Sequence, residues 1–169
     1  SSTTLELVIG DALASLVAIL RGLKREDFAI FHPGGALGRK LLTRVADVMA
    51  FGERMPIIQE GVSVKDALFV ITGKGYGTAC IVDKDGKLTG IFTDGDLRRL
   101  MEKKGTEAFD IKIENAMTKK PLTISPDSLA AEAVKIIEQK EISVLIAIDK
   151  NNKPVGIIHI HDLLNKGVM

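Results

Sequence analysis

Residues 78–97 read TACIVDKDGKLTGIFTDGDL, and 66 positions later residues 144–163 read VLIAIDKNNKPVGIIHIHDL. The same offset holds without a gap from 67–97 to 133–163. A repeat of about 60 residues is a whole supersecondary unit, and two copies are too few for a solenoid, which needs three or more. We therefore predict a pseudo-symmetric pair of units with a ligand cleft between them, and ligand binding ahead of catalysis as the function.

Each copy reads as an extended segment, then a helix, two strands and a second helix. The first copy is expected to have its extended segment at 56–58, a helix at 64–71 after the cap residue Ser63, and strands at 78–82 and 88–93. A hairpin joins these strands across Asp85-Gly86, where both turn residues are expected to have positive φ. The second copy has Asn151-Asn152 there, and Asn tolerates left-handed backbone. The strands are nearly all apolar, which is typical of sheets covered on at least one face by helices.

The first 44 residues precede the repeat. Residues 4–22 place apolar side chains at helical spacing over a broad arc, so this helix is expected to have neighbours on more than one side. We interpret 1–44 as the tail of a larger domain. The apolar run at 5–20 carries Glu6 and Asp11 and lacks a basic leader, unlike a signal peptide. We also expect it to be too short and too charged to span a bilayer.

The amino-acid composition limits the classes of binding partner and the cellular compartment that we expect for the protein. The 169 residues include 23 basic and 22 acidic side chains, a net charge of +1, which gives no electrostatic case for binding nucleic acid or a membrane surface. The single Cys80 excludes an internal disulfide framework and fits a reducing compartment. We predict a cytoplasmic protein.

The segment 90–97, Gly-Ile-Phe-Thr-Asp-Gly-Asp-Leu, carries the chemistry. A strand ends at Thr93 and enters a helix whose N-terminus suits a phosphate, to which Thr93 is able to donate a hydrogen bond. Asp96 is able to accept hydrogen bonds from a ribose diol, and Arg98 and Arg99 add positive charge in the first turn. The alternative is that Asp96 simply caps the helix, because aspartate is a favoured cap residue.

Two histidines stand at the equivalent place in the second copy. His159 and His161 alternate along a strand and are expected to face the same way. Such a pair is able to hold a metal, but no third ligand lies nearby in the sequence. We therefore predict no metal site and assign His159 to ligand contact or to the helix entry.

The segment that starts the second copy is a further candidate. Met117, Thr118 and Lys119 would line the cleft between the copies, and the lysine would meet a phosphate there. The alternative is that this lysine and Lys120 are solvated surface residues of a turn.

These tandem copies, each closing in Gly-apolar-apolar-x-x-x-Asp with Thr93 in the first, resemble a pair of CBS motifs, or Bateman module, over 45–169. The resemblance implies an α+β or α/β fold of two pseudo-two-fold-related motifs, at 45–105 and 113–169. It also implies nucleotide clefts in which Thr93 contacts phosphate and Asp96 binds ribose. In the second motif Asp162 matches the pattern, but His159 replaces the hydroxyl residue. That second site is therefore either empty or suited to a ligand that accepts an imidazole.

The segment 1–44 resembles the end of a sugar isomerase (SIS) domain. Ser-Ser-Thr-Thr at 1–4, Gly-Asp-Ala-Leu-Ala at 10–14 and His-Pro-Gly-Gly-Ala-Leu-Gly-Arg-Lys-Leu at 32–41 are similar to that region of bacterial D-arabinose 5-phosphate isomerases, which carry a CBS pair after the SIS domain. Those enzymes interconvert ribulose 5-phosphate and arabinose 5-phosphate for the lipopolysaccharide sugar Kdo. The resemblance implies that His32 is catalytic in the intact enzyme. This chain alone is expected to be inert, because the rest of that active site is absent.

Taken together, these resemblances imply a regulatory nucleotide-binding fragment that requires no cofactor. The candidate ligand is CMP-Kdo, the activated end product of the route, and AMP or ATP comes next. We expect a homo-oligomer, with CBS pairs forming a dimer and the parent enzyme a tetramer. The alternative function is an oligomerisation module that has lost its ligand.

Overall fold

The structure, a computed structural model, describes residues 2–23 and 41–169. The chain divides into two compact units, Ser1–Leu42 and Thr43–Met169, and helix α1 (Ser2–Leu20) belongs to the first. The helices of the second unit are α4 (Val64–Lys74), α5 (Asp94–Lys104), α6 (Ala130–Lys140) and α7 (Ile160–Asn165). Its strands are β1 (Ile57–Gln59), β2 (Thr78–Val82), β3 (Leu88–Thr93), β4 (Thr118–Lys119), β5 (Thr123–Ile124), β6 (Val144–Ile148) and β7 (Pro154–His159). Short 3-10 helices lie at Val45–Asp47, Gly52–Arg54, Gly105–Asp110 and Ile113–Asn115.

Helix α1 carries apolar side chains around its circumference and has no buried residue within its own unit. Among the described residues it is the one helix long and apolar enough to cross a membrane, with a mean hydropathy of 1.8. The prediction that this run is too short and too charged is therefore wrong, because the helix reaches back to Ser2 and only Glu6 and Asp11 are charged in it. The same length and composition describe a core helix of a soluble domain, the role that the SIS resemblance implies.

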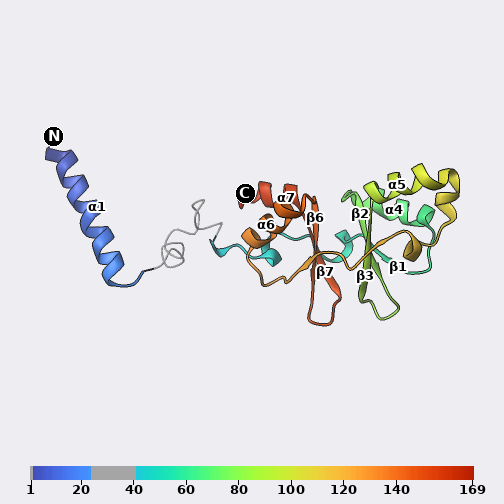
Figure 1. Cartoon of the computed structure of the whole chain (residues 1–169). Coiled ribbons are helices and arrows are strands. Elements are labelled where there is room, and N and C mark those ends of the chain that lie inside the picture. Colours follow the sequence, from blue (N-terminus) through green and yellow to red (C-terminus); the bar gives the residue numbers. More distant parts are fainter. Residues whose placement is uncertain (1, 24–40) are drawn as a thin grey trace. The chain divides into compact units, whose positions relative to one another are not determined.

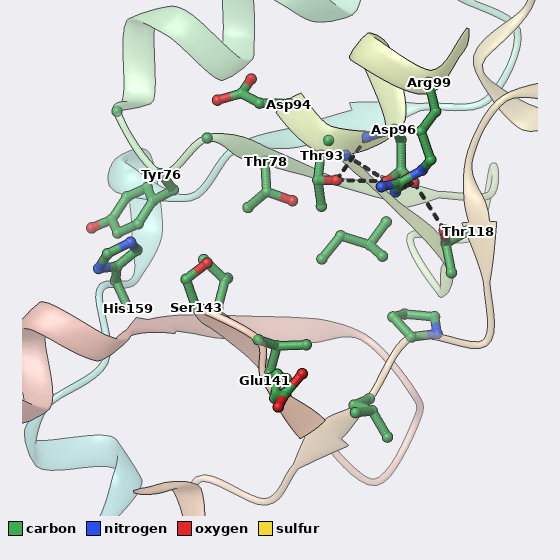
Figure 2. A pocket seen from close by; sticks show the side chains of 18 of the residues that line it. Tyr76, Thr78, Thr93, Asp94, Asp96, Arg99, Thr118, Glu141, Ser143 and His159 are labelled. Carbon is green, nitrogen blue, oxygen red and sulfur yellow. Dashed lines mark hydrogen bonds and ion pairs between the residues drawn. The ribbon is translucent and has the colours of Figure 1, made fainter. Parts of the chain in front are cut away.

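Each copy of the repeat folds into its own small sheet, so the predicted tandem architecture is confirmed. The strand orders are β1-β2-β3-β4 and β5-β6-β7, and in both copies a parallel first strand joins an antiparallel hairpin. Ser63 caps α4 as predicted, accepting a hydrogen bond from the backbone N–H three residues on at 3.2 Å. Figure 1 shows α4 and α5 beside the first sheet and α6 and α7 beside the second. Thr93 and His159, where β3 and β7 end, open into one cavity (Figure 2).

The hairpin turns differ from the prediction in one respect. Gly86 (φ 77°) and Asn152 (φ 62°) adopt the left-handed conformation, but the residues before them do not, so the expectation of two positive φ angles is wrong. The physical reason is a side-chain brace: one carboxylate oxygen of Asp83, and likewise of Asp149, accepts two backbone N–H groups of its own turn at 2.8–2.9 Å. The strand register also shifts beside each turn, which is typical of a turn closed by a bulge.

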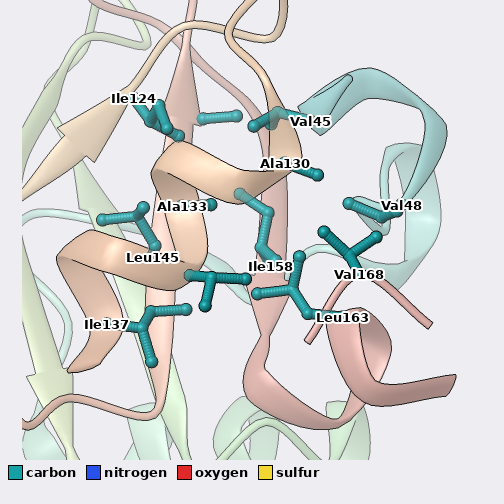
Figure 3. Packing of buried hydrophobic residues seen from close by; sticks show 12 residues of the cluster. Val45, Val48, Ile124, Ala130, Ala133, Ile137, Leu145, Ile158, Leu163 and Val168 are labelled. Carbon is teal, nitrogen blue, oxygen red and sulfur yellow. The ribbon is translucent and has the colours of Figure 1, made fainter. Parts of the chain in front are cut away.

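The opening segment of each copy packs into the core of the other copy. Val45 and Val48, which begin the first copy, are buried in the cluster of the second copy against Ala130 and Val168 (Figure 3). Ile113, which begins the second copy, takes the matching place in the cluster of the first copy and is fully buried. The sequence repeat and the packing unit therefore differ, because the copies exchange their first residues.

Backbone hydrogen bonds fix this exchange. Strand β4, from the start of the second copy, pairs antiparallel with β3 of the first copy. In the matching place Ala50 pairs with Ile157 of β7, and the two residues exchange N–H···O bonds of 2.8 and 2.9 Å. A third apolar cluster, which contains Cys80, Leu88 and Ile146, joins strands from both sheets. The second face of the central strands is therefore covered by the other copy.

Two glycines make room for the crossing segments. A Cβ built on Gly90 would overlap the sulfur of Met117 and lie 2.8 Å from its Cγ. A Cβ on Gly156 would meet Met49 in the same way, also 2.8 Å from Cγ. Real Cβ atoms essentially never approach other heavy atoms that closely. Glycine at these two repeat-equivalent positions is therefore a packing requirement of the exchange.

We expect Gly90→Ala to lower the free energy of unfolding by about 1–3 kcal/mol, because the added methyl group displaces Met117 and the strand beside it. Urea unfolding measures the loss. Gly73→Ala is the matched control: it lies in α4 with no atom within 4 Å of the added carbon, and should stabilise the protein by about 0.5–1 kcal/mol. If both variants were as stable as the wild type, the packing requirement would be refuted.

Candidate nucleotide cleft

A cavity of about 740 Å³ lies between the two copies (Figure 2). One wall is formed by the end of β3 and the start of α5, with the loop 75–77 beside it. The other wall comes from 118–122, which begins with the crossing strand β4, and from 141–144, which leads into β6. A volume of this size is typical of small-molecule sites, and the lining mixes apolar and charged side chains, as such sites do.

Thr93 and Asp96 form a reciprocal capping box at the start of α5. Thr93 Oγ1 accepts from the backbone N–H of Asp96 at 3.1 Å, while Asp96 Oδ2 accepts from the backbone N–H and the hydroxyl of Thr93 at 2.9 and 2.8 Å. Asp96 therefore does help to cap the helix, as the partner of an N-cap threonine. The Thr93 hydroxyl is committed to Asp96, so donating to a phosphate requires the hydroxyl to rotate.

The second carboxylate oxygen of Asp96 is directed at other residues of the cavity. Oδ1 accepts from Arg99 Nη2 at 2.7 Å and from the Thr118 hydroxyl at 3.4 Å. The Asp96 side chain is 12% exposed and that of Arg99 59%, so the arginine covers the acid from the solvent side. A ligand hydroxyl that donates to Oδ1 would compete with Arg99. One carboxylate is thus able to hold the helix start and a ligand diol together.

The structure brings some of the predicted residues together and separates others. Thr93, Asp96, Thr118 and His159 line the cavity. Arg98, Met117, Lys119 and Asp162 do not; their role in binding stays a prediction.

Three of the residues outside the cavity have an identifiable local environment. Met117 packs on Gly90, Lys119 is exposed in β4, and Asp162 Oδ2 accepts from the His159 backbone N–H at 3.0 Å. Arg99, rather than Arg98, reaches the cavity because a spacing of three residues places it on the same helix face as Asp96.

His159 replaces the N-cap hydroxyl in the second copy. Its Nδ1 accepts from the backbone N–H of His161 at 3.2 Å, and the two rings stack with centroids 4.8 Å apart. Burial, and then the neighbouring His161, lowers the pKa of His159, whereas the charge of Asp162 acts in the opposite direction. An imidazole that accepts at Nδ1 and is hard to protonate is thus a neutral helix cap.

Tyr76 is a cavity residue that the sequence interpretation missed. Figure 2 shows it at the same end of the cavity as His159. Burial raises the pKa of the Tyr76 phenol, and so does the negative charge of Asp162, while Arg54 lowers it. The repeat was the signal available in the sequence. Tyr76 lies in the loop before β2, and the equivalent loop of the second copy, 141–143 before β6, also lines the cavity.

No cluster of three or more His, Cys, Asp or Glu side chains suited to a metal occurs within 2–23 and 41–169, and the absence of a metal site stays a prediction. Cys80 is buried, and burial raises its pKa to about 12, so its thiol is not a nucleophile at neutral pH. His32 lies outside the described residues.

A comparison with known protein families identifies the family to which the chain belongs. The family model described as CBS domain matches residues 45–103 and 110–168. The chain belongs to the CBS domain family. The predicted CBS pair is thereby confirmed, and the cavity lies between its two motifs.

The whole chain, including the segment before the CBS pair, also has curated relatives. Arabinose 5-phosphate isomerase KdsD of Pseudomonas aeruginosa is 48% identical over all 169 residues, which are 52% of that protein, and KdsD of Escherichia coli K12 is 43% identical over 51% of its length. The predicted resemblance to these isomerases is confirmed, and the chain spans about half the length of the curated relatives it matches.

Solved structures show the same fold at low identity. CBSX2 in complex with AMP gives a TM-score of 0.65 at 21% identity, covering 73% of this chain and 94% of that one. The CBS pair of MJ0100, in complex with 5-methylthioadenosine and S-adenosyl-L-methionine, gives 0.64 at 23% identity, with the same coverage.

We expect His159→Thr to flatten the dependence of stability on pH. His159 has a folded-state pKa below its ordinary value of 6.5, so the unfolded chain binds the proton more readily. The wild type therefore loses stability as the pH falls below about 6.5 towards the folded-state pKa, and the threonine variant, which keeps a cap hydroxyl, loses less. Melting temperatures between pH 7.5 and 5 measure both profiles. Parallel profiles would contradict the neutral imidazole cap.

Proposed function

We propose that the CBS pair is the regulatory nucleotide-binding part of an arabinose 5-phosphate isomerase of the cytoplasm. The observation that carries the proposal is the arrangement around Asp96 in the cavity. The start of α5 supplies the positive end of a helix dipole, and Arg99 and Lys120 add positive charge at the same cavity. Asp96 Oδ1 is an acceptor for a ribose hydroxyl. A phosphate and a ribose therefore both find suitable partners.

The intact enzyme would interconvert ribulose 5-phosphate and arabinose 5-phosphate, as the resemblance of its sequence implies, and its KdsD relatives are named arabinose 5-phosphate isomerases. In that enzyme His32 would be the catalytic histidine, and α1 would be covered by the sugar isomerase domain. A ligand in the CBS cavity would regulate the isomerase only if it bound one arrangement of the enzyme better than another.

The leading ligand is CMP-Kdo, because a ribose-binding cleft on the first enzyme of a route is a natural point for feedback by its activated end product. Adenine nucleotides are the second candidate, since the same fold holds AMP in CBSX2. An oligomerisation module without a ligand is the third. It is favoured by His159, which replaces the hydroxyl in the second motif.

Calorimetric titration of this chain with CMP-Kdo, CMP, AMP and ATP tests the proposal. We expect saturable binding of CMP-Kdo. Binding of AMP or ATP alone would make the protein an adenine-nucleotide sensor. No heat and no thermal shift with any of the four would refute nucleotide binding and leave the oligomerisation module.

Asp96→Ala should abolish that binding and also lower the free energy of unfolding by about 0.5–2 kcal/mol, because the variant loses its half of the capping box. Asp66→Ala is the matched control. It removes the carboxylate that accepts from the hydroxyl of Ser63 at the start of α4, also with a loss of stability, but Asp66 does not line the cavity and its loss should leave binding intact. Calorimetry and thermal unfolding on both variants separate the two roles. Equal affinity in both would show that Asp96 is only a cap.

A further inference from the structure

Two residues of the cavity have a backbone conformation that their side chains disfavour. Among the described residues, those other than glycine with positive φ are Lys120 (φ 53°), Glu141 (φ 51°) and Asn152 (φ 62°). Lys120 and Glu141 both line the cavity, and both are exposed at its rim. Asparagine is a residue type that adopts this conformation readily, but lysine and glutamate are not. Both residues with the disfavoured conformation therefore lie at the cavity.

The first motif shows that neither backbone position requires a side chain. Glu141 closes α6 with its N–H on the carbonyls of Ile137 and Glu138, and Gly75 closes α4 in the same way at φ 73°. Lys120 follows the crossing strand of the second motif, where the first motif has Gly52 at φ 63°. Glycine satisfies each turn without strain. The charged side chains must therefore be explained by something other than the turn.

Their positions in the cavity suggest that explanation. Figure 2 shows Glu141 across the cavity from Thr93 and Asp96, the residues proposed to hold ribose and phosphate. Lys120 lies next to Pro121 on 118–122, which forms part of the same wall as Glu141. A nucleotide held at Asp96 would extend its other half towards Glu141 and Lys120. Opposite charges there suit a group that carries both hydrogen-bond donors and an acid.

We propose that Lys120 and Glu141 are the specificity-determining residues of this cavity, and that they recognise the acidic-sugar half of a nucleotide-sugar. Lys120 pairs with the carboxylate of the sugar, and Glu141 accepts hydrogen bonds from its hydroxyl groups. The inference rests on the proposed function and adds to it the two residues that recognise the sugar half of the ligand. Lys120 and Glu141 are therefore kept in a strained left-handed conformation because their side chains contact the sugar.

The test combines Lys120→Gly, Glu141→Gly and Glu141→Gln with thermal unfolding and calorimetric titration of CMP-Kdo and CMP. Each glycine variant should raise the Tm by about 2–4 °C, because glycine relieves the strain. All three should weaken CMP-Kdo binding by about tenfold or more, through the loss of a charge-assisted contact, and should change CMP binding far less. Glu141→Gln keeps the backbone and loses the charge, so its Tm should not rise.

Asn152→Gly is the matched control, since it changes a third left-handed residue that does not line the cavity. Its affinity for CMP-Kdo should equal that of the wild type. Unchanged CMP-Kdo affinity in the Lys120 and Glu141 variants would overturn the assignment while leaving nucleotide binding in place. An equal loss for CMP and CMP-Kdo would also overturn it, because the contacts would then be to the nucleotide half. A wild type that binds neither CMP-Kdo nor CMP would overturn this inference, and only if it also failed to bind AMP and ATP would the proposed function be refuted with it.

Discussion

The reciprocal contact between a methionine of one copy and a glycine of the other is the constraint on which the rest of the structure depends. Met117 lies on Gly90 and Met49 on Gly156, so neither glycine has room for a side chain. Each contact lets the opening segment of one copy join the sheet and the core of the other. Because Thr118 and the residues after it are carried across, the cavity has walls from both copies.

The two motifs share a backbone design but differ in chemistry. The first motif caps its second helix with the Thr93 hydroxyl, and the second motif uses the His159 imidazole, with an aspartate completing the box in both. Where the first motif has glycine in left-handed turns, the second has Lys120 and Glu141. The pseudo-symmetric fold thus supplies one cavity with unlike ends, which is what recognition of an asymmetric ligand requires.

Sequence patterns predicted the local elements well because those elements depend on neighbouring residues. The hairpins, the Ser63 cap and the tandem arrangement follow from alternation, turn residues and the repeat. The turn geometry at Asp85 was missed because the Asp83 side chain braces the turn. The exchange of segments was beyond prediction, since it depends on contacts such as Ala50 with Ile157, over a hundred residues apart. The sequence predicted positive charge from both Arg98 and Arg99, and helix geometry places only Arg99 at the cavity.

The central claim is that the cavity between the motifs is a nucleotide site centred on Asp96. A crystal structure of the chain grown with CMP-Kdo tests it most directly. The account predicts ligand density between Thr93 and Glu141, with a ribose hydroxyl within about 3.2 Å of an Asp96 carboxylate oxygen. Ligand density elsewhere on the molecule, with Asp96 still paired only with Arg99, would contradict it.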